Sequence, residues 1–183
     1  MKHRAAYSLF FIASLLIAEP LTQEQMIQKG TEVSTTLVQK LGSELKTQMQ
    51  AGGPIAALHF CSQNALSLTD QVAKESGTSI KRVSIQNRNP VNAATSEEKA
   101  VLNQWQKMLK NSKTLPPYEL TKLSNGHTVY YKPIIINAET CLKCHGDIAG
   151  DSSLGKAIKE TYPEDRATGY KMGDLRGMVV VTF

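Results

Sequence analysis

The order of helix-like and strand-like segments constrains the fold of this chain most. Apolar residues recur every three or four positions over residues 22–50, which predicts a long amphipathic helix. The sequence AGGP should end it, because Gly52 and Gly53 are poor helix formers and Pro54 suits the first turn of a new helix. That second helix is expected over residues 54–76, with Gly77 as its C-terminal cap.

Strand signals follow the two helices. Residues 79–85, SIKRVSI, predict a strand, and the capping-box pair Thr95 and Glu98 predicts a helix that places Trp105 inward. Two strands are expected around the Asn125-Gly126 turn, then a short helix near 155–160 and a last strand in GMVVVTF. Helices followed by strands, without β-α-β alternation, predict one α+β domain with an antiparallel sheet and a long N-terminal helical section.

The N-terminus has the form of an export signal. Lys2 and Arg4 precede an apolar run over residues 7–18, which is shorter than the ~20 residues of a membrane span. We expect a cleaved signal peptide at 1–18 and a periplasmic domain at 22–183, with an uncleaved anchor as the alternative. Without Lys2 and Arg4 the formal net charge falls from +5 to +3, and no basic cluster predicts nucleic-acid binding.

The stretch AETCLKCHGD carries Cys141, Cys144 and His145, and so two of the three cysteines of the chain. C-x-x-C-H is the attachment sequence of a c-type haem. Two intervening residues let one turn of backbone bring the thiols to the two vinyl groups of the porphyrin. The histidine then stands beneath the iron as an axial ligand. We therefore predict a covalently attached haem c, with its iron bound by His145.

Three other interpretations of the cysteine pair compete with haem attachment. A redox-active disulfide would normally open a helix in a thioredoxin-like βαβ unit, which is not predicted here. A structural zinc site needs four ligands, often as two cysteine pairs, and the sequence has no second pair. An inert disulfide across so short a loop would stabilise the fold little. An export signal together with C-x-x-C-H favours haem.

Cys61 is the odd thiol. Helical spacing places it on a buried stripe, which by itself favours a small apolar core residue over a sixth ligand to the iron. The rival sixth ligands are His59, His127, Met108, Met172 and Met178. Cations that could pair with haem propionates, or else lie on the solvated surface, are Arg82, Arg88, Arg166, Lys171 and Arg176. No catalytic arrangement is evident, so we expect no enzyme.

Three segments, KRVSIQNRNPVNAAT, CLKCHG and YPEDRATGYKMGDLRG, together resemble the PAS-like c-type haem domain family of cyanobacteria and other bacteria. The domain is also the sensor portion of some histidine kinases. The resemblance covers residues 22–183. It implies a PAS-like antiparallel sheet, thioether links at Cys141 and Cys144, and His145 as one axial ligand. It also implies a cysteine as the second ligand, at the position of Cys61.

The resemblance implies a redox- or gas-responsive haem sensor. Release of Cys61 on reduction would open the iron to CO or NO, and the signal would pass to a separate protein. The alternative is a single-haem electron carrier with a redox partner. In both cases an anionic thiolate ligand predicts a low reduction potential, because it stabilises ferric over ferrous iron.

Overall fold

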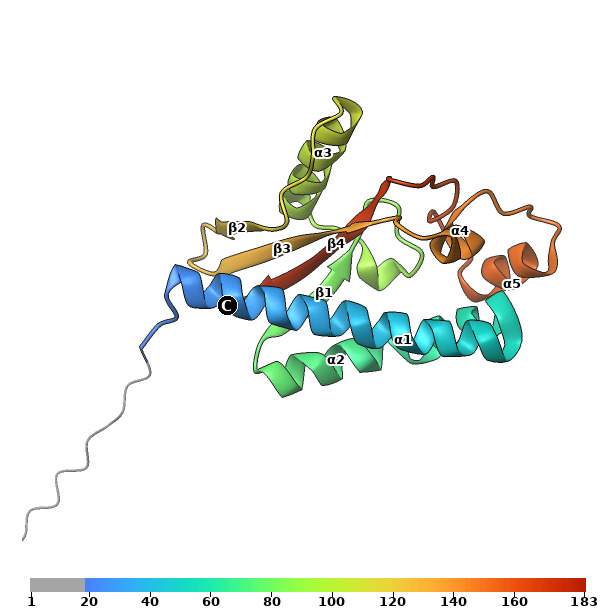
Figure 1. The fold of residues 1–183 in the computed structure, drawn as a ribbon, viewed down its shortest axis with the longest axis horizontal. Coiled ribbons are helices and arrows are strands. Elements are labelled where there is room, and N and C mark those ends of the chain that lie inside the picture. The colour runs from blue at the N-terminus through green and yellow to red at the C-terminus, as the bar shows by residue number, and fades with distance from the viewer. Residues whose placement is uncertain (1–18) are drawn as a thin grey trace, which may run out of the picture.

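The computed structural model describes residues 19–183, so the predicted signal peptide at 1–18 lies outside the described residues. The elements in chain order are α1 (Gln23–Gln63), α2 (Ala65–Ser76), β1 (Ser79–Val83), the 3-10 helix η1 (Pro90–Asn92), α3 (Ser96–Lys110), β2 (Glu119–Lys122), β3 (Thr128–Ile135), α4 (Glu139–His145), α5 (Ser153–Thr161) and β4 (Leu175–Thr182) (Figure 1). Within residues 19–183, none of the helices is long and apolar enough to cross a membrane.

The four strands form one sheet in the order β1-β4-β3-β2, and every neighbouring pair is antiparallel. The predicted α+β class with an antiparallel sheet is confirmed. Helices α1 and α2 cover one face, where Leu37 and Val72 pack on Val179. Helix α3 covers the other face with Trp105, and the predicted capping box of Thr95 and Glu98 is present at its start.

The predicted break at AGGP is confirmed. Gly52 and Gly53 have non-helical backbone angles, Gly53 with φ +69°, so the range of α1 combines two helical segments that meet at a kink. A proline is compatible with the first turn of the segment that follows. The predicted helix over 54–76 is interrupted only by a turn at Asn64, where backbone hydrogen bonds on both sides keep helical spacing, and Gly77 caps its end as predicted.

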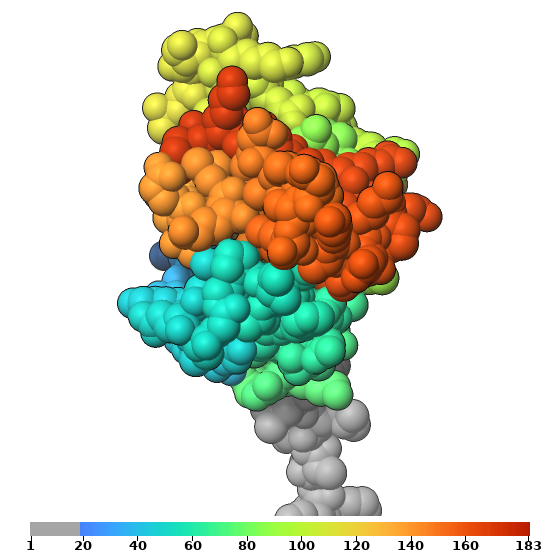
Figure 2. All heavy atoms as spheres, turned by 90° about the vertical axis from the view of Figure 1, so that its right-hand side faces the viewer, coloured from blue at the N-terminus to red at the C-terminus, as the bar shows by residue number. Residues whose placement is uncertain are grey.

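The kink sends the end of α1 toward a small lobe between β3 and β4. This lobe contains α4, α5 and the loops around them (Figure 1). Leu58, beyond the kink, packs on Ile158 and Tyr162 of the lobe. Figure 2 shows this end of the molecule, with the end of α1 lying directly against the α4–α5 segment. Residues 54–63 are thereby positioned opposite the C-x-x-C-H motif.

Gly30 provides a test of the packing between α1 and the sheet. A Cβ at this position would lie 2.5 Å from Cγ of the fully buried Tyr130 ring, whereas a Cβ at Gly42 of the same helix meets nothing within 4 Å. Gly30→Ala should lower the free energy of unfolding by about 1–3 kcal/mol through overpacking. Gly42→Ala should raise it by up to about 1 kcal/mol through helix propensity. Urea unfolding measures both, and equal effects would contradict the packing described here.

Candidate functional site

The C-x-x-C-H motif lies on α4, a helix of only seven residues that the sequence did not predict as a helix. Cys141 and Cys144 are both partly buried, and neither forms a disulfide. Gly146 ends the helix in a tight position, because a Cβ there would lie 2.6 Å from the carbonyl oxygen of Leu142. The motif is therefore held as one compact turn with its two thiols free.

His145 has the hydrogen bonding of a metal ligand. Its Nδ1 lies 2.8 Å from the carbonyl oxygen of Ala167. A carbonyl can only accept, so Nδ1 carries the proton and Nε2 keeps its lone pair. Burial, together with the cations of Arg176 and Arg88, lowers the pKa of His145 to about 3. The imidazole is therefore neutral at physiological pH, as an iron ligand must be, and its orientation is fixed by the second hydrogen bond.

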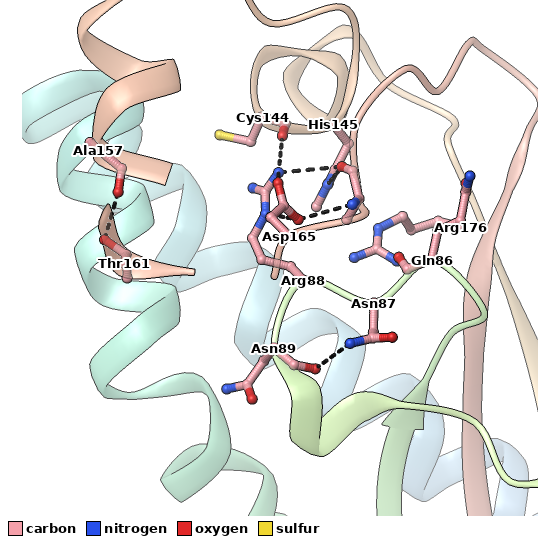
Figure 3. A network of polar contacts seen from close by, with 11 residues as sticks. Gln86, Asn87, Arg88, Asn89, Cys144, His145, Ala157, Thr161, Asp165 and Arg176 are labelled. Carbon is pink, nitrogen blue, oxygen red and sulfur yellow. Dashed lines mark hydrogen bonds and ion pairs between the residues drawn. The ribbon is translucent and has the colours of Figure 1, made fainter. Parts of the chain in front are cut away.

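Arg88 connects the motif to two other segments (Figure 3). Its side chain is buried, and it forms a two-point ion pair with Asp165 over two distances of 3.1 Å. The same guanidinium donates to the carbonyl oxygens of Cys144, at 2.7 Å, and Ala167, at 3.3 Å. Arg88 thus fixes both α4 and the carbonyl that orients His145.

A cavity lies between α4, the end of α1 and the sheet, with about 780 Å³ of empty space including the part open to solvent. Cys61 of α1 lines it together with Cys141, Cys144 and His145, although 80 residues separate it from the motif. The remaining lining side chains are Leu45, Met49, Ala57, Leu58, Ala65, Leu66, Arg82, Arg88, Asn89, Asn92, Thr140, Tyr162 and Arg176.

The thiols of Cys61 and Cys144 are protonated when no metal binds them. Burial raises the pKa of the Cys61 thiol, and the nearby cation of Arg82 opposes this only in part. Burial also raises the pKa of the Cys144 thiol, against the cation of Arg88. Across residues 19–183, no three His, Cys, Asp or Glu side chains lie close enough together to hold a bare metal ion. Donors spread around a cavity suit a metal at the centre of a large ring better than a bare zinc ion.

The rival ligands named from the sequence lie elsewhere. His59, His127 and Met172 are exposed, while Met108 and Met178 belong to the core under α3. Of the described residues, only one methionine lines the cavity, Met49 of α1. The sequence placed Met49 on an apolar stripe, and only the kink after it reveals that the stripe faces a cavity.

Comparison with known proteins identifies the family of this chain. The family model described as Tll0287-like matches residues 18–183. The chain belongs to the Tll0287-like family. Among solved structures, the crystal structure of the cyanobacterial heme-protein Tll0287 is similar at 25% sequence identity with a TM-score of 0.63. The match covers 89% of this chain and 96% of that one, so the likeness to this family extends through both the sheet and the lobe. No curated protein matches the chain.

The ion pair of Arg88 can be tested by substitution. Arg88→Gln should lower the free energy of unfolding by about 3–5 kcal/mol, because it leaves the carboxylate of Asp165 buried without its cation. Combining it with Asp165→Asn should recover part of the loss. The exposed Arg166 offers a matched control, and Arg166→Gln should stay within about 0.5 kcal/mol. A loss below about 1 kcal/mol for Arg88→Gln would contradict the role given to the pair.

Proposed function

We propose that the cavity binds one haem, attached through thioether bonds to Cys141 and Cys144, with His145 as an axial ligand to the iron. The bond from His145 Nδ1 to the Ala167 carbonyl carries this proposal, because it leaves Nε2 unprotonated for a metal. The donor set fits the group: two free thiols and a neutral imidazole on one turn, beside a cavity. The similarity to a haem protein over nearly the whole chain supports it.

We propose Cys61 as the second axial ligand. It lines the same cavity from the opposite wall, on the segment that the Gly52–Gly53 kink turns toward α4. Burial raises the pKa of its thiol, and the nearby cation of Arg82 opposes this in part. The rivals His59 and His127 are exposed. The spacing of the sequence had favoured a core role for Cys61, and its position in the cavity supports the ligand role that the family resemblance implied.

We infer a redox- or gas-responsive sensor as the function of such a site. When bound, the haem would supply a redox-active iron that takes up CO or NO once a coordination position is free. The raised pKa of the Cys61 thiol supports release, because a protonated cysteine behaves as a small apolar residue and can remain buried without a partner. The protein environment thus favours the protonated thiol once the iron releases it. An electron carrier would keep both ligands in both oxidation states. We propose no catalytic reaction for this site.

The setting we propose is the periplasm, after export through residues 1–18. Covalent attachment suits an exported protein, because a haem lost in that compartment would not be replaced. A separate protein would receive the signal or the electron.

The identity of the second ligand can be tested with three variants. Cys61→Ala should convert the ferric protein from a low-spin, thiolate-ligated form to one that binds added cyanide or imidazole at once. Met49→Leu should keep the thiolate signature, and so should the control His59→Ala, which alters an exposed residue on the same helix. Electron paramagnetic resonance and visible spectra of the ferric proteins report the ligands. Loss of the sixth ligand in Met49→Leu but not in Cys61→Ala would refute the assignment.

Ligand release on reduction separates the sensor from the carrier. The reduced wild-type protein should bind CO, because loss or protonation of the Cys61 thiolate frees one position on the iron. The measurement is the visible spectrum of dithionite-reduced protein before and after CO, with Cys61→Ala as the fully open reference. A reduced protein that stays six-coordinate and ignores CO would favour the electron carrier.

A further inference from the structure

Two of the three arginines in the cavity have no counter-ion. Arg88 is neutralised by Asp165, but Arg82 and Arg176 form no ion pair within residues 19–183. The described residues that line the cavity include no Asp or Glu. Burial lowers the pKa of both guanidinium groups, because it removes the water that hydrates the charged form. Two such charges within one cavity are costly unless an anion joins them.

The hydrogen bonds of both arginines are incomplete. Only three buried side-chain nitrogen or oxygen atoms in the described chain lack a partner, and two of them are Nε of Arg82 and Nε of Arg176. Arg82 reaches the Ala65 carbonyl only at 3.5 Å. Arg176 donates to the Gln86 carbonyl at 3.1 Å and lies over the ring of Tyr170 at 5.3 Å. Each guanidinium therefore keeps donors that a planar acceptor such as a carboxylate can satisfy.

A β-bulge brings Arg176 to this side of the sheet. In the pairing of β3 with β4, Ile134 faces Gly177 and Ile135 faces Leu175, so Arg176 is the extra residue. Leu175 and Met178 both contribute to the core under α3, although regular alternation would place them on opposite faces. The bulge shifts the alternation and gives Arg176 to the cavity, where Figure 3 shows it beside Gln86. Bulges that redirect a side chain in this way are frequent beside functional sites.

We propose that Arg82 of β1 and Arg176 of β4 form the binding site for the two haem propionates. The inference rests on the proposed haem. The vinyl and propionate groups occupy opposite edges of the porphyrin. The thiols for the vinyl edge come from α4, and the two cations come from the strands on the sheet side of the cavity. Two monoanionic carboxylates match two monovalent cations. The other candidates named from the sequence are excluded by their positions, since Arg88 is already paired and Arg166 and Lys171 are exposed.

The test follows the propionates directly. Protein produced with 5-aminolevulinic acid labelled with ¹³C at its carboxyl carbon carries the label in the propionate carboxyls. Isotope-edited infrared spectra at pH 7 then show their bands alone. In Arg82→Gln and Arg176→Gln, the labelled carboxylate bands should shift or give way to the band of a protonated acid. In Arg166→Gln, which removes one exposed cation, they should stay as in the wild type. Lysine variants at 82 and 176, which keep the charge and lose the planar fork, should show smaller shifts.

Several results would overturn the assignment. Unchanged propionate bands in the glutamine variants with haem still attached would do so, and the proposed haem function would remain intact. If Arg82→Gln changes the axial-ligand spectrum and leaves the propionate bands unchanged, Arg82 acts on Cys61 and does not bind a propionate. If the variants fail to fold, the wild-type protein alone still tests the propionate site. Its labelled bands should differ from those of the haem peptide released by proteolysis, whose propionates are in water, and identical bands would refute the site. Haem-free wild-type protein would contradict the proposed function itself.

Discussion

The ion pair between Arg88 and Asp165 is the interaction on which the rest of the site depends. Arg88 follows β1, Asp165 follows α5, and the same guanidinium holds carbonyls of α4 and of the loop that orients His145. These segments have no regular secondary structure in common, and α4 has only seven residues. A buried two-point ion pair with further hydrogen bonds fixes their relative positions where a small apolar core could not. Without this ion pair, the Ala167 carbonyl would no longer be fixed in place, and it is this carbonyl that orients the His145 imidazole.

The cavity results from two departures from regular structure. The glycine kink turns the end of α1 toward α4 and brings Cys61 across from the C-x-x-C-H turn. The bulge in β4 turns Arg176 from the α3 side of the sheet to the cavity side. Each departure costs regular hydrogen bonding or backbone freedom. The kink brings Cys61 to the cavity, and the bulge brings Arg176. The sheet and α3 are regular by comparison and supply the support.

The sequence was most informative where its signal was local. Periodicity, the capping box at Thr95 and the Asn125-Gly126 turn predicted the helices, the hairpin and the α+β class. They did so because backbone geometry and side-chain alternation follow from neighbouring residues. The C-x-x-C-H motif was likewise visible from its spacing. The break at Gly52 and Gly53 was also predicted locally, from the AGGP sequence, and both residues have non-helical backbone angles.

The long-range parts of the site could not be predicted from local pattern. Spacing alone gave Cys61 a core role, because a residue 80 positions from the motif shares a cavity with it only through the kink. Among five candidate cations, only tertiary contacts separate Arg88, which is paired, from Arg82 and Arg176, which are not. Met49 was missed as a cavity residue, because local spacing does not show that its apolar stripe faces a cavity. In each case the deciding information is which elements meet, not which residues are neighbours.

Mass spectrometry of the intact exported protein and its peptides measures whether a haem is covalently attached at α4, as proposed. The peptide spanning Cys141 to His145 should carry the added mass of one haem, and Cys61 should remain an unmodified thiol. An unmodified Cys141–Cys144 peptide, or one that has lost two hydrogens to a disulfide, would refute covalent attachment.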